Sequence, residues 1–111
     1  MATKQALLAH LSKPREVRAV PVEGLGEPLH VRMLNVGERL RLQAAIKAAP
    51  EFDSLVILSF GLSDERGEAL FAEGETEDVG RLDMDTVEAA TEALIELNKL
   101  RPADVDGIEK N

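Results

Sequence analysis

The chain has 111 residues, a length typical of a single domain, and its 44% of hydrophobic residues suffice for a core without covalent staples. It contains no cysteine, which excludes disulfide bonds, thiolate metal sites and thiol nucleophiles. Its 21 acidic residues outnumber its 13 basic residues, and the resulting net charge of −8 makes nucleic acid an unfavourable partner.

The first part of the chain predicts a helix followed by a β-hairpin. Leucines at helical spacing predict a short helix within residues 1–14, which Pro14 ends and which we expect to fray. Residues 15–34 predict the hairpin, because apolar and polar residues alternate on both sides of a glycine-containing turn of about five residues at 24–28. Pro21 lacks a backbone donor, so the first strand is expected at a sheet edge.

Asn35 is expected to begin the next helix. Its side chain can accept a hydrogen bond from the N–H of Glu38 while the Glu38 side chain reaches back, which forms a capping box. Pro50 follows Ala49 and should end the helix there. The apolar stripe of this helix is expected to contain Val36, Leu40, Ala44 and Lys47, with Leu42 and Ile46 beside it.

Residues 55–58 are a continuous apolar run, which is compatible with a buried strand or a buried helix. An N-cap at Asp53 or Ser54, together with Gly61 near the end, favours a helix, and this helix would be the central core element. After a polar turn, Leu70-Phe71 predicts a short extended piece that could join the hairpin as a third strand.

The C-terminal part predicts acidic helices. Asp83 or Asp85 can cap a long helix that has glutamates on one face, and Pro102 suits the first turn of a short helix over 102–110. The apolar stripe of the long helix contains Val87, Ala90, Leu94 and Leu97, widened by Ile95 and Leu100.

These elements predict one α+β domain over residues 1–111. It should be mainly helical, with a two- or three-stranded antiparallel hairpin at 15–34 packed against about three helices, most of them within 35–111. The charge is uneven: residues 1–50 hold eight basic and four acidic residues, a net +4, whereas residues 51–111 hold five and seventeen, a net −12. Such a chain can fold against itself or meet a second copy head to tail.

Sites for chemistry are not evident in the sequence. His10 and His30 have no partner at metal-ligand spacing, and no glycine lies at the sixth place of a calcium-binding loop. The serines lack a glycine-framed elbow, and Gly24-Leu25-Gly26 is not followed by the third glycine of a dinucleotide loop. We therefore expect no catalytic residue, no metal and no cofactor, and interpret the chain as a non-enzyme.

Several segments, taken in order, carry a resemblance to a known family. They are Val20-Pro21-Val22 with the strand that follows, the segment 64–71 (Asp-Glu-Arg-Gly-Glu-Ala-Leu-Phe), and 97–100 (Leu-Asn-Lys-Leu) in the last helix. Together they resemble the short tail assembly chaperones of long-tailed, siphovirus-like bacteriophages and prophages. The resemblance covers nearly the whole chain and is one of pattern and order.

The resemblance implies a non-enzymatic role in tail assembly. Such chaperones coat the tape measure protein, keep it soluble and recruit tail tube subunits, often through a frameshifted longer form that contacts the tube protein. They act in the cytoplasm of the bacterial host and leave before the virion is complete. Covering a long client takes many copies, so self-association is expected. No signal peptide or membrane-spanning segment is predicted, so a membrane is not an expected partner.

The client should present helices, which favours the C-terminal helices as the binding surface over the hairpin edge at 15–22. The expected acidic contacts, which would set the register, are Glu92 and Glu96, and the expected apolar contacts are Leu94, Ile95, Leu97, Leu100 and Val105. The alternative is that this apolar stripe is simply core. Two other functions also remain open: a structural head–tail connector or minor virion protein, and a small acidic regulatory adaptor.

Overall fold

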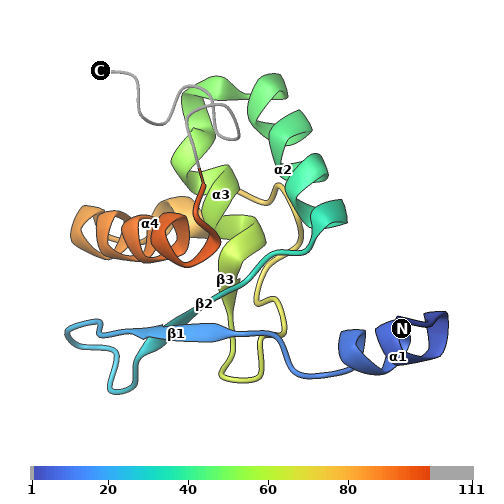
Figure 1. Ribbon diagram of the computed structural model, residues 1–111. Coiled ribbons are helices and arrows are strands. Elements are labelled where there is room, and N and C mark those ends of the chain that lie inside the picture. The colour runs from blue at the N-terminus through green and yellow to red at the C-terminus, as the bar shows by residue number, and fades with distance from the viewer. Residues whose placement is uncertain (1, 101–111) are drawn as a thin grey trace.

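The computed structural model describes residues 2–100, which form an α+β domain, as predicted (Figure 1). The predicted short helix over 102–110 lies outside the described residues. In chain order the elements are α1 (Lys4–Leu11), β1 (Val17–Val20), β2 (Leu29–Arg32), α2 (Val36–Ala48), the 3-10 turn η1 (Pro50–Phe52), α3 (Asp53–Gly61), β3 (Leu62–Ser63), the 3-10 turn η2 (Val79–Arg81) and α4 (Met84–Asn98).

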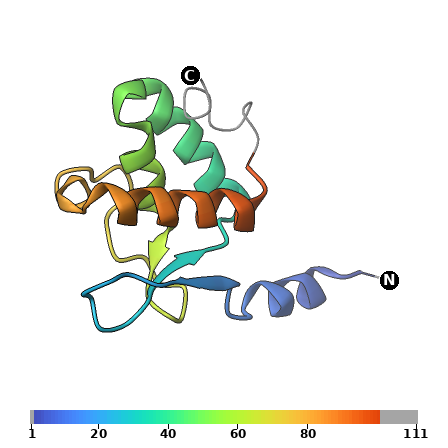
Figure 2. The same cartoon turned by 90° about the vertical axis from the view of Figure 1, so that its left-hand side faces the viewer.

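Helix α4 lies between two layers. The sheet packs on one side of it, and the helix pair α2–α3 lies on the other (Figure 2). Because α4 touches both layers, its apolar face joins the sheet to α3 in one core. The largest fully buried side chains of that core are Phe60, Leu42, Ile57, Leu58, Leu62 and Leu94.

The sheet has the order β1-β2-β3 and is antiparallel throughout, so β1 is an edge strand, as predicted. Val20 pairs with Leu29, so the hairpin connection runs over residues 21–28 and is longer than the predicted turn of about five residues. The third strand is β3, which continues directly from α3. The predicted piece at Leu70-Phe71 is not a full strand. The N–H of Leu70 donates to the carbonyl of Leu62 at 3.1 Å, and Ala69 forms an isolated antiparallel bridge with Ser63.

The helix starts follow the capping predictions in two of three cases. Asn35 and Glu38 form the predicted capping box of α2, and Asp83 caps α4 by accepting from the N–H of Thr86 at 3.1 Å. Helix α3 confirms that the apolar run is helical, but Phe52 is its N-cap residue. The turn η1 leads directly into α3, so Asp53 already lies within the helix.

The buried face of α2 differs from the predicted stripe. Val36 and Leu40 are 75% and 60% exposed, and the residues that face the core are Glu38, Leu42 and Ile46. These three are spaced four apart and so lie on one face of the helix. The capping box explains the difference, because it fixes Glu38 inward toward the sheet and thereby selects the face that follows it.

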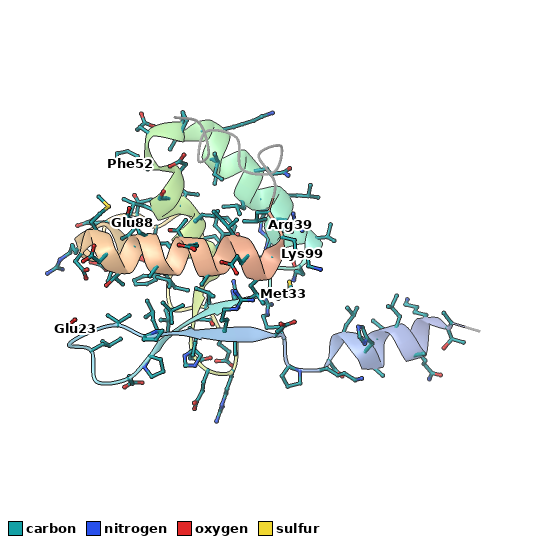
Figure 3. All side chains as sticks on the ribbon, turned by 60° about the vertical axis from the view of Figure 1, so that its left-hand side comes forward. Glu23, Met33, Arg39, Phe52, Glu88 and Lys99 are labelled. Carbon is teal, nitrogen blue, oxygen red and sulfur yellow. The ribbon has the colours of Figure 1, made fainter. Side chains whose placement is uncertain are left out.

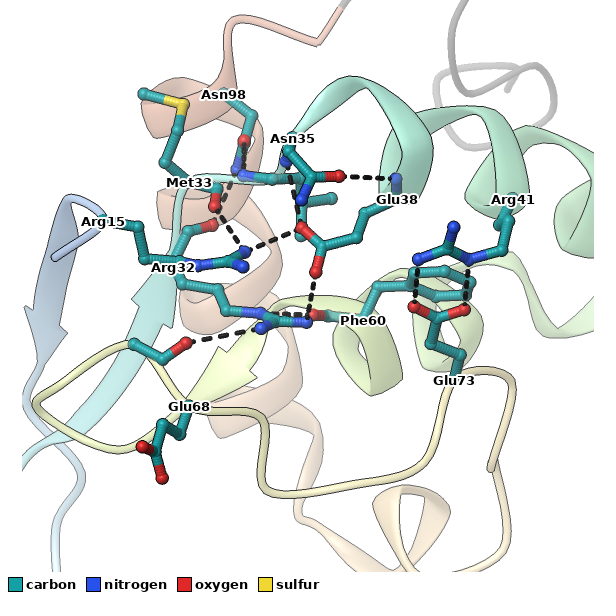
Figure 4. Close-up of polar contacts among 12 residues, drawn as sticks. Arg15, Arg32, Met33, Asn35, Glu38, Arg41, Phe60, Glu68, Glu73 and Asn98 are labelled. Atoms are coloured by element: carbon teal, nitrogen blue, oxygen red, sulfur yellow. Dashed lines mark hydrogen bonds and ion pairs between the residues drawn. The ribbon is translucent and has the colours of Figure 1, made fainter. Parts of the chain in front are cut away.

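A buried ion pair joins the sheet to α2. The guanidinium of Arg32 is 3.3 Å from the carboxylate of Glu38, and both side chains are almost completely buried. Arg15 donates to the same carboxylate at 2.7 Å and to the carbonyl of Met33 at 3.1 Å (Figure 4). Arg32 also donates to the carbonyl of Phe60 at 2.9 Å, so the pair reaches α3 as well.

Asn98 connects the end of α4 to the same region. Its side-chain oxygen accepts from the N–H of Leu34 at 2.7 Å, and its side-chain nitrogen donates to the carbonyls of Arg32 and Leu94 (Figure 4). The peptide groups that leave β2 therefore have partners although they are buried. Asn98 and Glu38 together hold the segment between β2 and α2 in place.

Helix α1 stands apart from this core. Thr3 caps it by accepting from the N–H of Ala6 at 3.1 Å, but every residue of α1 is exposed. Figures 1 and 2 both show α1 projecting from the end of β1, away from the other helices. Leu7, Leu8 and Leu11 are 57%, 52% and 66% exposed, so this helix buries none of its leucines within the domain.

The packing of α3 against α4 requires a glycine at position 61. A β-carbon at this position would collide with the side chain of Leu94, which is fully buried. We predict that Gly61→Ala lowers the free energy of unfolding by about 1–3 kcal/mol, because the packed core must shift to admit the methyl group. Thermal unfolding followed by circular dichroism measures the change. The matched control is Gly37→Ala, whose new methyl group would meet the end of the flexible Arg41 side chain at 3.3 Å and the side-chain oxygen of Asn35 at an ordinary 3.6 Å, and should leave stability unchanged or slightly raised. Equal melting temperatures for the two variants would contradict the packing argument.

The ion pair predicts a dependence of stability on pH. Burial raises the pKa of Glu38, but the hydrogen bonds from Arg15 and Asn35 and the charge of Arg32 outweigh it and hold the pKa below its ordinary value. This carboxylate therefore stabilises the fold above the unfolded-state pKa, near 4.3, and loses that contribution as the pH falls through the lower folded-state pKa.

We predict that Glu38→Gln destabilises the domain by about 3 kcal/mol at neutral pH, because Arg32 loses its buried anionic partner. The difference from the unsubstituted chain should shrink as the pH falls below the unfolded-state pKa and through the lower folded-state pKa, where Glu38 itself becomes neutral. Urea unfolding at several pH values measures it. A difference that stays constant over this range would show that the charge of Glu38 does not matter.

Candidate functional site

A groove of about 1000 Å³ lies between α4 and the start of α3. One wall is the outer face of α4 from Met84 to Glu96, and the other is the segment 51–55, which contains η1 and the first turn of α3. Figure 3 shows Phe52 and Glu88, one from each wall, on the same side of the molecule. The groove is open to solvent, and it is larger than the recess of about 370 Å³ beside the hairpin connection, which Leu25 and Leu70 line.

Apolar side chains form much of the groove surface. Phe52 and Met84 are 49% and 69% exposed, which is unusual for such large apolar groups. Pro50 opens the turn η1 and places Phe52 at its end, where the side chain points outward rather than into the core. Other apolar side chains in the groove are Leu55, Leu82, Val87 and Ile95.

Acidic side chains surround this apolar surface. Glu88, Glu92 and Glu96 are spaced four apart on α4 and are all exposed, so they form one row along the helix. Glu51 and Asp53 stand on the opposite wall, and none of the described residues that line the groove is basic. At the end of the row, Glu96 lies 3.5 Å from Arg18 of β1, and both of these side chains are largely exposed. The groove therefore has an apolar surface with a negative rim.

The capped ends of α4 fix the direction of the row. Asp83 accepts from the hydroxyl of Thr86 at 2.6 Å as well as from its N–H, and these bonds lower the pKa of the Asp83 carboxyl. Lys99 ends the helix in the left-handed conformation, with φ +52°. The glutamate row thus lies on a helix that is capped at both ends, and the caps hold the three carboxylates at helical spacing.

Thr91 is an unusual part of the groove. It lies in the α4 wall, is 8% exposed, and its hydroxyl oxygen has no hydrogen-bond partner among the described residues. An unpaired buried hydroxyl is costly, and the great majority of such groups in native proteins have a partner. The hydroxyl oxygen itself has almost no exposed surface, so it is an unsatisfied group beneath the groove wall.

The structure divides the predicted contact residues into two groups. Glu92, Ile95 and Glu96 line the groove. Leu94, Leu97 and Leu100 are 0%, 5% and 7% exposed, so they are core residues, which was the alternative interpretation. The reason is that the sheet and α3 cover this face of α4. Val105 lies outside the described residues.

Sequence reasoning missed Phe52, Leu82 and Met84. Phe52 lies in η1, whereas Leu82 and Met84 lie just before and at the start of α4, so only the folded chain brings Phe52 beside the other two. One signal was available: Phe52 is one of three phenylalanines and lies two residues after Pro50, between acidic neighbours. A large apolar residue in an acidic turn is a candidate for an exposed contact.

The features considered for chemistry are dispersed. His10 lies on the exposed α1, and His30 is half-buried on β2, opposite Ser63. The hydroxyl of Ser63 donates to the carbonyl of Asp64 at 2.9 Å, so the backbone already engages it. Within residues 2–100, no group of three or more histidine, cysteine or acidic side chains is placed to hold a metal ion.

Comparison of the chain with protein-family models, with curated proteins and with solved structures finds no match. Among the described helices, none combines the length and apolar character needed to cross a membrane.

The unpaired hydroxyl of Thr91 makes a testable prediction. Thr91→Val keeps the volume of the side chain and removes an unsatisfied buried group, so we expect stability to rise by about 1 kcal/mol. The control is Thr86→Val on the same helix, where an equally buried hydroxyl is bonded to Asp83, and this change should lower the melting temperature. Calorimetry of both variants measures the contrast. A loss of stability in Thr91→Val as large as that in Thr86→Val would mean that the Thr91 hydroxyl group is satisfied in the folded protein.

Proposed function

We propose that the protein is a non-enzymatic bacteriophage tail assembly chaperone. In this role it binds the tape measure protein, keeps it soluble in the cytoplasm of the bacterial host, and helps to recruit tail tube subunits. It is then released and is absent from the mature virion. The resemblance of the sequence to short tail assembly chaperones supports this role.

The observation that carries the proposal is the groove with an apolar surface and an acidic rim. A client helix with an apolar stripe can bury that stripe against Phe52 and Ile95, while basic residues beside the stripe meet the glutamate row of α4. Burial of the apolar stripe supplies affinity, and the charges set orientation and the rate of association. Binding of this kind keeps an exposed apolar helix in solution, which is the task of a chaperone for a long helical client.

The groove replaces the core leucines as the place to test. Leu97 is 5% exposed, so Leu97→Asp would put a charge into the core and report on folding rather than on binding. Phe52 and Glu92 are exposed, and substitutions there leave the core intact. The test is coexpression of the chain with a phage tape measure protein, with the amount of soluble client as the measurement.

We predict that Phe52→Asp weakens client binding roughly tenfold or more, because it removes an apolar anchor from the groove. Glu92→Lys should weaken binding less and mainly slow association, an effect that high salt reduces. The matched control is Glu77→Lys, an equal change of charge at an exposed site outside the groove. A client that stays equally soluble with Phe52→Asp and with Glu77→Lys would contradict the proposal. Detection of the protein in purified virions by mass spectrometry would instead favour the structural connector.

A further inference from the structure

The groove and helix α1 are complementary parts of the same chain. Leu7, Leu8 and Leu11 form an exposed apolar face on α1, and the groove offers an apolar surface. Helix α1 and the residues directly beside it contain Lys4 and Lys13 and no acidic residue, whereas the groove is lined by five acidic residues and no described basic one. Helix α1 and the groove therefore carry opposite charges, and both present apolar surface.

The sizes also agree. Helix α1 has eight residues, which corresponds to a length of about 12 Å. The α4 wall runs from Met84 to Glu96, about 18 Å of helix, so the groove can take all of α1.

The base of α1 is fixed on the other side of the molecule. Arg15 is held by Glu38 and by the carbonyl of Met33, and the carbonyl of Glu16 accepts from the N–H of Met33 at 2.8 Å. Only residues 12–14 separate this anchor from α1, and an extended chain of three residues spans roughly 10 Å. Figure 3 shows α1 at the opposite end of the molecule from Phe52 and Glu88. A second copy has no such tether and can lay its α1 along the whole groove.

We infer that the groove is the receptor for α1 of a second copy of this chain. The contact is heterologous, because each copy gives α1 on one side and accepts a neighbour's α1 on the other. Copies then associate head to tail, and the groove is filled by the neighbour's α1 until a client helix displaces it. The inference goes beyond the proposed function and does not rest on it.

The test uses the full chain at low salt and millimolar concentration, with mass measured by light scattering. The unsubstituted chain should be larger than a monomer, and high salt should reduce its mass. Leu8→Asp removes the apolar face of α1, and Phe52→Asp damages the groove, so each variant alone should be monomeric. Leu25→Asp changes an equally exposed leucine in the hairpin connection and is the matched control, which should associate like the unsubstituted chain.

Mixing the two variants gives the decisive result. Phe52→Asp still carries an intact α1, and Leu8→Asp still carries an intact groove, so an equimolar mixture should form a dimer and nothing larger. A mixture that remains monomeric, a Leu8→Asp variant that associates normally, or an unsubstituted chain that stays monomeric would each overturn the inference. The last of these results would also be obtained if α1 filled the groove of its own copy.

The outcome is separable from that of the proposed function. Leu8→Asp leaves the groove intact, so it should still bind the client if the chain is a chaperone, whatever happens to self-association. Circular dichroism of both variants checks the fold, and Glu88→Lys combined with Glu92→Lys provides a second groove variant should Phe52→Asp disturb it. This pair reverses the rim charge at exposed positions and should weaken association, most clearly at low salt.

Discussion

The fold depends on one buried carboxylate. Glu38 accepts hydrogen bonds from the N–H of Asn35 and from Arg15, and it forms an ion pair with Arg32. This one side chain therefore caps α2, holds the chain before β1 and neutralises a cation inside the sheet. A hairpin of this size is marginal in water, and it needs helices to cover it. A buried charge is tolerated only with its partner in place, so the pair restricts how the sheet and α2 can meet.

That restriction also determines which surface of α4 remains free. Once α2 and α3 are fixed over one side and the sheet over another, α4 has to bury Leu94 and Leu97 between them. The row of glutamates is left facing outward, and the turn at Pro50 brings Phe52 up beside it. The groove is therefore a consequence of the packing: it is the part of the α4 surface that neither layer covers.

Local chemistry made much of the fold predictable. Capping at Asn35 and Asp83 and the prolines after α1 and α2 act within a few residues, and each prediction from them was right. The alternation in β2 predicted the strand correctly, but it placed Arg32 on the polar face, whereas Arg32 is 5% exposed. The predictions that failed needed knowledge of a partner element. The stripe of α2 was predicted from hydrophobicity alone. The buried face of the helix is instead the one that contains Glu38, because this residue is bound to Arg32. Nor could the stripe of α4 by itself reveal that two layers cover it, so core leucines were taken for a contact surface.

In the fold, the uneven charge along the chain becomes a separation of basic and acidic residues between two ends of the molecule. Of the basic residues in the first half, Arg15 and Arg32 are used inside the domain, whereas Lys4 and Lys13 remain exposed on and beside α1. Acidic residues of the second half collect around the groove at the other end of the molecule. With this charge separation, two basic ends or two acidic ends of neighbouring copies repel each other, whereas a basic end and an acidic end attract each other. High net charge alone keeps copies apart, so the apolar faces of α1 and the groove must supply the affinity, while the charges determine which ends meet.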